Sequence, residues 1–187
     1  MSDTLSDIRA RYACRAFSDQ PVPAATLHTI AEAGLHAPSA VNRQPWRVIA
    51  VTNRDAIAAL ETAGLAALKA TDATMYERIQ GRGGKLLYNA QAIIVVAEEP
   101  LDGPFPAALD VGIVASHVAL AATSLGVNCV IAALPGFAFS GPDGPALRDL
   151  FHFPEGYRFG ISILLGYAAG APGTPHEIDL AKLIEIA

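Results

Sequence analysis

The sequence predicts a single domain of class α+β or α/β, in which helices cover both faces of a small central sheet. Helical periods alternate along the whole chain with short strand-like runs. One of these runs, residues 92–97 (AIIVVA), is apolar throughout, as a strand buried on both faces must be. No linker, repeat or low-complexity tract interrupts the pattern. We therefore expect one domain over residues 1–187.

The first quarter of the chain predicts two helices and a strand. Apolar residues recur at helical spacing over residues 4–17, and the prolines of residues 21–23 end that helix. A second helix is expected over residues 24–36. Residues 37–46 are held irregular by two prolines, and residues 47–52 (RVIAVT) follow as a strand.

The middle of the chain is helical apart from the buried run. Residues 54–70 are rich in Ala and Leu and predict a helix. Residues 71–87 are polar and contain three glycines, which leaves open a mobile connection or a short helix followed by a loop. Residues 109–125 form a long helix that Gly126 ends. This helix is apolar nearly all round, so we expect it in the core or at an interface.

The last third predicts the remaining strands. Residues 128–134 (NCVIAAL) form a third strand, the sequence GPDGP caps a helix over residues 146–152, and residues 158–167 form a fourth strand. The tail from Ala168 is rich in Pro and Gly and finishes in an apolar stretch, residues 180–186.

Composition excludes several classes of function. A net charge of -5 argues against general affinity for nucleic acid. No run approaches the roughly 20 apolar residues of a membrane helix, and the N-terminus has no apolar signal core, so we expect a cytoplasmic protein without membrane contact. Hydrophobic residues make up 52% of the chain and charged residues only 17%. This surplus favours burial of surface against a second copy.

Familiar catalytic and metal-binding patterns are missing from the sequence. Cys14 and Cys129 lie far apart and read as buried hydrophobes, and the histidines have no metal-ligand spacing. The sequence GRGGK at residues 81–85 departs from a phosphate loop, and no GxGxxG follows a strand. Carboxylates such as Asp110 and Glu98 show no paired geometry, so we expect no protein acid, base or nucleophile.

Two polar clusters stand out. Arg11 and Arg15 are spaced i, i+4, which predicts two guanidinium groups on one helix face, suited to a phosphate dianion. A solvated face with Asp7 and Asp19 as neighbours is the alternative. The second cluster, the loop of residues 37–46, offers uncharged hydrogen-bonding side chains that suit the ribityl hydroxyls and polar edge of a flavin. A turn-forming loop with no ligand is its alternative. The polar residues of this loop are Ser39, Asn42 and Gln44.

Together these clusters resemble the FMN-dependent nitroreductase family. The matching residues are Arg11-x-x-x-Arg15-x-Phe17, Pro21-Val22, Ala37-Pro38-Ser39-Ala40 and Asn42-x-Gln44-Pro45-Trp46, and weaker landmarks follow at Ala92 to Val96, Asp110-Val111-Gly112, Gly126-Val127, Pro154-Glu155-Gly156-Tyr157 and Gly166-Tyr167. The resemblance covers the chain to about residue 170.

The resemblance implies an α+β fold, an intertwined homodimer and FMN bound at the interface. Arg11 and Arg15, in one segment with Tyr12 and Ala13, would serve the phosphate and the ribityl or pyrimidine region. The loop of Pro38, Ser39, Ala40, Asn42 and Gln44 would reach the flavin of the partner subunit. A backbone N–H in the turn after the third strand, at Ile131, Ala132 and Ala133, would face flavin N5.

The implied reaction is the cofactor's own. Hydride passes from NAD(P)H to flavin N5 and on to a small acceptor such as a nitroaromatic or a quinone. Two alternatives remain open. One is a flavin-binding protein without reductase activity, and the other is a branch that uses flavin for a different reaction.

The chain departs from the family at the phosphate. The family often has Ser where this chain has Ala13, and many members carry Lys or Arg after the final strand where only His176 is available here. Lys85 is a further candidate contact. The departures imply either weaker FMN binding or a phosphate held by backbone N–H groups.

Overall fold

A computed structural model describes residues 3–101 and 106–186. Its centre is a four-stranded sheet in the order β1-β2-β4-β3, in which every neighbouring pair is antiparallel. Antiparallel pairing decides for the α+β class over α/β, because α/β crossovers produce parallel strands. The strands are β1 (Trp46–Val51), β2 (Ala92–Glu98), β3 (Asn128–Ala132) and β4 (Arg158–Gly166).

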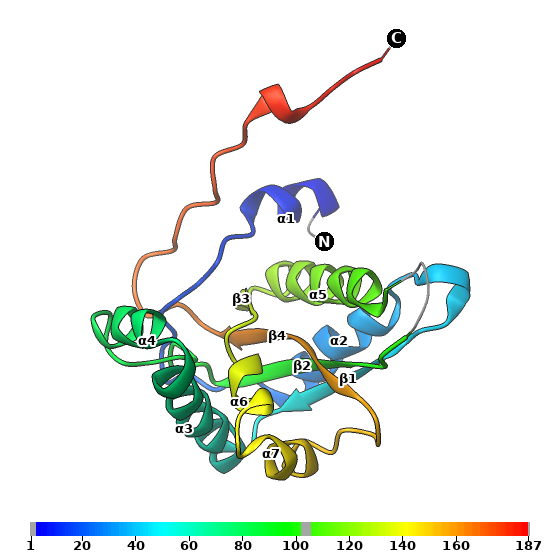
Figure 1. The fold of residues 1–187 in the computed structure, drawn as a ribbon. Helices are drawn as coiled ribbons and strands as arrows, with labels where there is room; N and C mark the ends of the chain where they lie inside the picture. Colours follow the sequence, from blue (N-terminus) through cyan, green and yellow to red (C-terminus); the bar gives the residue numbers. More distant parts are fainter. Residues whose placement is uncertain (1–2, 102–105, 187) are drawn as a thin grey trace.

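Helices cover both faces of this sheet, as expected (Figure 1). Helices α2 and α5 lie on one face with α1 beyond α5, and α3, α4, α6 and α7 lie on the other. The helices are α1 (Thr4–Ala10), α2 (Ala24–Leu35), α3 (Arg54–Thr71), α4 (Ala73–Gln80), α5 (Ala107–Ser124), α6 (Gly136–Ser140) and α7 (Gly144–Leu150), with 3-10 turns η1 (Ala40–Asn42) and η2 (Leu180–Lys182).

The buried strand predicted from AIIVVA is β2. Every residue of β2 is buried, and its side chains contribute alternately to two separate cores. One core holds Ile93 and Val95 with α3, and the other holds Ile94 and Val96 with α5. The period-2 alternation of a strand explains this division. Cys14 belongs to the first core and Cys129 to the second, and both thiols are free.

The long apolar helix expected over residues 109–125 is α5. It ends where Gly126 adopts φ +72, a conformation that glycine tolerates at a helix C-terminus. By length and composition alone α5 could cross a membrane, but its buried side packs on α2 and on three strands of the sheet. Its inner face therefore belongs to the core of the domain.

The first helix is shorter than predicted. We expected helix over residues 4–17, but α1 ends at Ala10 and Arg11 is already extended. The N–H groups that would continue the helix donate to the sheet and to the loop before β2: Cys14 to the Cys129 carbonyl (3.0 Å), Phe17 to Tyr88 (3.1 Å) and Ser18 to Tyr167 (2.8 Å). Long-range pairing therefore overrides the helical period here.

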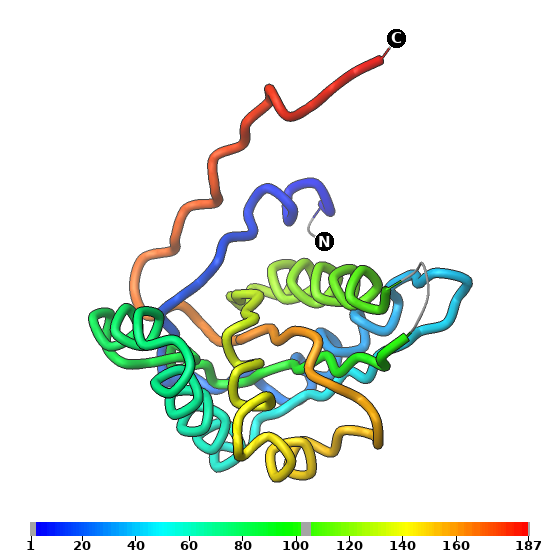
Figure 2. Tube along the Cα trace, in the orientation of Figure 1, coloured from blue at the N-terminus to red at the C-terminus, as the bar shows by residue number. Residues whose placement is uncertain are grey.

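The C-terminal tail leaves the body of the domain. After an isolated bridge between Phe17 and Ala168, the chain runs past α1 as an extended segment with one 3-10 turn (Figure 2). Its apolar residues are exposed in this single chain, with Ile184 82% and Ile186 95% accessible. Exposed apolar side chains in series are typical of interaction surfaces.

Phe17 fixes the N-terminal segment to the end of β4. It is buried (3% exposed), and a Cβ added at Gly166 would lie 2.9 to 3.1 Å from three of its carbon atoms. The ring therefore needs a residue without a side chain at position 166.

We expect Gly166→Ala to lower the free energy of unfolding by about 1–3 kcal/mol, because the new methyl group must displace the Phe17 ring. Chemical denaturation measures the change. Gly81→Ala is the matched control, since Gly81 has αR dihedrals and an added Cβ would meet only ordinary contacts at 3.5 Å or more. Equal stability of the two variants would contradict the proposed role of Gly166.

Candidate functional site

The arginine segment, residues 11–17, lies between two parts of the sheet. On one side the Cys14 N–H donates to the carbonyl of Cys129, near the start of β3. On the other side the Ala169 N–H donates to the Ala16 carbonyl at 3.0 Å. Tyr12 is fixed through its hydroxyl, which accepts from Asn128 Nδ2 at 3.2 Å. These bonds hold the segment as an added strand beside β3.

Arg11 and Arg15 share a side of this segment, although they are not on a helix. In an extended chain, side chains alternate, so residues i and i+4 again point the same way while Cys14 turns into the core. Arg11 is half-buried and Arg15 exposed. Within the described residues, neither guanidinium forms an ion pair with a carboxylate, and Asp19 instead accepts from Asn89. Neutralisation by Asp19 is therefore not what the geometry shows.

The Arg11 guanidinium lies close enough to the Cys129 thiol to affect its pKa. Burial raises the pKa of the Cys129 thiol to about 11, while the nearby Arg11 guanidinium acts in the opposite direction and Cys14 adds to the rise. The thiol stays protonated near neutral pH, so it is a poor nucleophile. Arg11 therefore lies against the start of β3 as a positive charge beside neutral groups.

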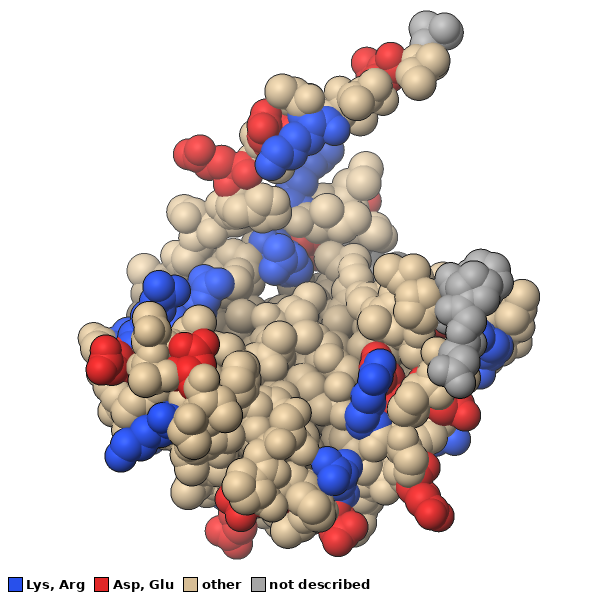
Figure 3. All heavy atoms as spheres, in the orientation of Figure 1, with Lys and Arg blue, Asp and Glu red and all other residues tan. Residues whose placement is uncertain are grey.

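The cleft at Arg11 is small in a single chain. Its volume is about 80 Å³, below the roughly 300 Å³ at which ligand pockets begin. Figure 3 shows a hollow between α1 and the body of the domain, with basic side chains around it. The cleft in a single chain is therefore too small to enclose a ligand by itself. The residues lining the cleft are Ala10, Arg11, Tyr12, Thr123, Gly126, Val127, Asn128 and Cys129.

The second cluster forms a strained, solvent-facing loop over residues 38–44. Val41, Asn42 and Gln44 all have positive φ, between 49° and 58°, a region that a β-branched residue such as Val rarely enters. The loop is closed from within, because the Ser39 hydroxyl accepts from the Gln44 N–H at 2.9 Å and the Asn42 side chain accepts from Gln44 Nε2 at 2.9 Å. Strain of this kind gathers at binding sites.

The loop is also bonded to α5. The Ala40 N–H donates to Asp110 Oδ1 at 3.2 Å, and Asp110 lies near the start of that helix. Trp46 at the base of the loop is 3% exposed, so it anchors that end of the loop in the core.

A single chain keeps the two clusters apart. The arginine segment bonds to Cys129, just after the C-terminal end of α5, whereas loop 38–44 bonds to Asp110 at its N-terminal end. At 1.5 Å per residue the intervening helix is about 20 Å long, and Figure 1 shows the clusters at its opposite ends.

The turn after β3 offers unpaired backbone donors. In the described part of the chain, the N–H groups of Ala133 and Leu134 donate to no acceptor. The preceding residue is fixed, since the Ala132 carbonyl accepts from the buried Ser162 hydroxyl at 2.7 Å. Of the residues expected in this turn, Ile131 and Ala132 still belong to β3, and only Ala133 lies beyond it. Ile131 and Ala133 are exposed, so this end of the strand can meet a ligand.

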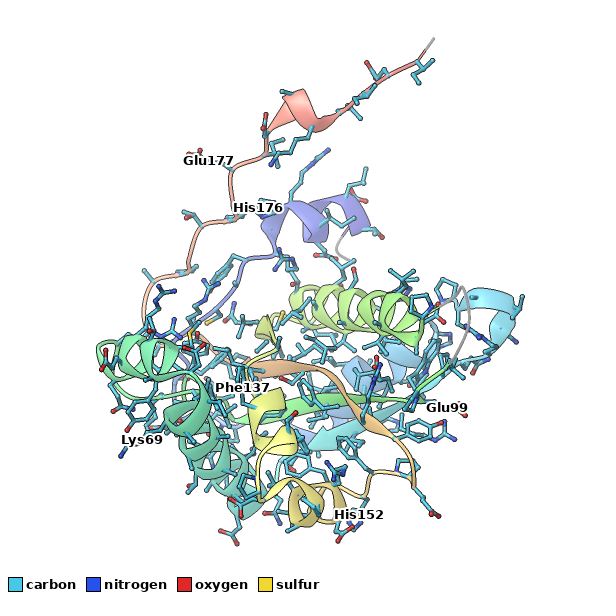
Figure 4. The ribbon with its side chains drawn as sticks, viewed as in Figure 1. Lys69, Glu99, Phe137, His152, His176 and Glu177 are labelled. Carbon is cyan, nitrogen blue, oxygen red and sulfur yellow. The ribbon has the colours of Figure 1, made fainter. Side chains whose placement is uncertain are left out.

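The remaining candidates lie on the surface. His176 is exposed on the tail, level with α1 in Figure 4. The tail approaches Tyr12 closely before it, because a Cβ added at Gly173 would lie 2.7 Å from the ring. Lys85 lines a separate cavity of about 270 Å³ with Arg54 and Glu61, and these residues take no part in the cleft at Arg11.

Sequence reasoning missed three residues that organise the site. Asn128 binds Tyr12 and also accepts from the Ala168 N–H at 2.9 Å, Ser162 holds the turn after β3, and Asp110 holds loop 38–44. A carboxylate within an otherwise apolar helix was a usable signal for Asp110. The other two lie within ordinary strands and carry no comparable signal.

Solved structures of known proteins share this arrangement. The chain aligns over its full length with a nitroreductase from Desulfitobacterium hafniense DCB-2 that contains bound FMN, with 42% identity, a TM-score of 0.93 and 100% of both chains covered. A nitroreductase from Bacteroides fragilis NCTC 9343, also with bound FMN, aligns with 26% identity, a TM-score of 0.88 and the same coverage.

Sequence comparison gives the same result. A Methanothermobacter thermautotrophicus protein, provisionally named an NADH dehydrogenase/NAD(P)H nitroreductase, is 30% identical over 96% of this chain and 87% of its own length. The sequence model of the nitroreductase family matches residues 8–167. The chain belongs to the nitroreductase family.

Proposed function

We propose that the protein is a cytoplasmic FMN-dependent oxidoreductase that transfers hydride from NAD(P)H to a small acceptor such as a nitroaromatic or a quinone. The observation that carries the proposal is the arginine segment, where two guanidinium groups with no carboxylate partner among the described residues lie on one side of an extended chain. Relatives with bound FMN support the cofactor, and the name of the Methanothermobacter relative supports the donor.

The residues present suit FMN. Arg11 and Arg15 provide the positive charge that a phosphate requires, and Tyr12 and Ala13 present the backbone between them. Ala13 lacks the hydroxyl common in the family, so the arginines carry more of the phosphate binding. His176 is the tail residue proposed to add to it.

The chain's role in the reaction is to bind, orient and stabilise charge. FMN, once bound, would supply the redox chemistry, namely hydride transfer from NAD(P)H to the acceptor. The N–H groups at Ala133 and Leu134 are free to orient the polar edge of the ring, and small side chains at Ala132 and Ala133 let the backbone approach it. A guanidinium near the pyrimidine ring stabilises negative charge there.

We propose that the active species is a homodimer in which loop 38–44 of one subunit completes the site of the other. The separation of the two clusters along α5 supports this, because one chain cannot bring them to one flavin. Exposed apolar side chains on α1, on α5 and along the tail supply a surface for the partner. They include Leu5, Ile8, Leu109, Ile178, Leu183, Ile184 and Ile186.

A flavin-binding protein without reductase activity is the second candidate. The absence of a hydroxyl at Ala13 and the exposure of His176 favour it, because both weaken the grip on the phosphate. The redox behaviour of the bound cofactor distinguishes this candidate from an active reductase.

The purified protein should be yellow or become yellow with added FMN, and NADH or NADPH should bleach it in the absence of oxygen. Absorbance near the flavin maximum measures both steps. Bleaching by dithionite but not by either nicotinamide would favour the second candidate. Failure to take up FMN would contradict both.

Arg11→Ala should weaken FMN binding by about 1–3 kcal/mol, because one charge-assisted hydrogen bond to the phosphate is lost. Quenching of FMN fluorescence measures the affinity. Arg78→Ala, which removes an exposed arginine of α4, is the control and should bind as the wild type does. An unchanged affinity in Arg11→Ala would remove Arg11 from the site.

Light scattering should give a mass close to twice 19.5 kDa. Ile184→Asp places a charge on the exposed apolar tail and should raise the monomer fraction and lower FMN occupancy together. A monomer that retains FMN with wild-type affinity would contradict the shared site.

A further inference from the structure

Asp110 is an unusual residue for its place. It lies in the first turns of α5, whose other inward-facing residues are Ala and Val, and it is only 5% exposed. Carboxylates this deeply buried are rare unless they are paired. Within the described residues Asp110 has no cationic partner, and its Oδ2 has no hydrogen-bond partner of any kind.

The other oxygen of Asp110 reaches across the chain to loop 38–44. Oδ1 accepts the Ala40 N–H, a contact between residues 70 positions apart in sequence. Further hydrogen bonds close the turn on itself, because the side chains of Ser39 and Asn42 both accept from Gln44. The bond to Asp110 therefore attaches a self-closed turn to a rigid helix.

The loop needs such an attachment. Three residues of the loop, Val41, Asn42 and Gln44, are held at positive φ, which is strained for residues other than glycine. A strained turn relaxes unless its surroundings hold it. Asp110 does so from the buried side, while the polar side chains face outward.

We propose that Asp110 is the positioning residue for loop 38–44, and that it acts on the cofactor site of the partner subunit rather than on that of its own chain. The inference rests on the proposed function for the identity of the cofactor. It assigns to a buried carboxylate a part in FMN binding at a site of the partner subunit.

The orphaned oxygen supports a functional reason for the carboxylate. A buried acceptor without a donor costs free energy, so a residue selected for stability alone would be apolar or fully paired at this place. Position near the N-terminus of α5 offsets part of the cost, because the helix dipole favours a negative charge there. What the carboxylate provides in return is a charge-assisted hydrogen bond to the loop.

The first experiment measures the loop in the protein without cofactor. Hydrogen exchange of the peptide spanning residues 38–45 should be faster in Asp110→Ala than in the wild type, and Asp110→Asn should restore much of the protection, because its side-chain oxygen can still accept. Asp55→Ala is the matched control: Asp55 is likewise an acid in the first turn of an 18-residue helix, but it is exposed. Equal exchange in Asp110→Ala and wild type would overturn the proposal.

The second experiment measures FMN affinity by fluorescence titration. Asp110→Ala should raise the dissociation constant about tenfold, as loss of a hydrogen bond to a charged group does, with Asp110→Asn between it and the wild type. Asp55→Ala should not change it. An Asp110→Ala affinity equal to that of the wild type overturns this inference alone, whereas a wild-type protein that binds no FMN overturns the proposed function.

The third experiment separates action in the partner from action within the chain. Co-expressed chains with two affinity tags yield mixed dimers of an Arg11→Ala chain and an Asp110→Ala chain. If Asp110 acts on the partner's site, both defects fall in one site and the other site is wild type, so each dimer binds one FMN with wild-type affinity. If Asp110 acts within its own chain, each site carries one defect and no wild-type site remains, which would overturn the assignment.

Discussion

The backbone hydrogen bonds between residues 13–18 and the sheet are the interaction on which the rest of the molecule depends. They end α1 at Ala10, turn the arginine segment into an added strand beside β3, and seat Phe17 over Gly166. A helix would have carried the two arginines away from the sheet. Strand pairing keeps the segment that carries them beside β3.

This same segment shows where prediction from sequence stops. The spacing of Leu5, Ile8 and Tyr12 fits a helix, but a spacing of four also gives one side in an extended chain, and local periodicity cannot separate the two. The competing hydrogen bonds come from residues more than 70 positions away, at Tyr88, Cys129 and Tyr167. By contrast, β2 was predictable, because a fully apolar run of strand length has few other solutions in a domain of this size.

The candidate site, too, could be predicted from the sequence only in part. The family resemblance, carried by the arginine segment and loop 38–44, is confirmed, and the α+β fold with it. The roles of individual residues remain proposals. Asp110 stands out in the sequence as a carboxylate in an apolar helix, but its role and that of Ser162 could not be assigned, because each role lies in one long-range hydrogen bond, to Ala40 and to Ala132 respectively. A residue that holds another in place leaves no motif of its own.

Helix α5 has a consequence beyond its place in the core. In the proposed homodimer it is a spacer with one half of the proposed cofactor site near each end, so its length would set the distance between the two sites and the alignment of the residues that line them. One residue inserted in α5 would shift its far end by about 1.5 Å and rotate it by about 100°. Both sites would then be misaligned by a single change, so evolution of this domain is expected to tolerate loop insertions far more readily than any change in the length of this helix.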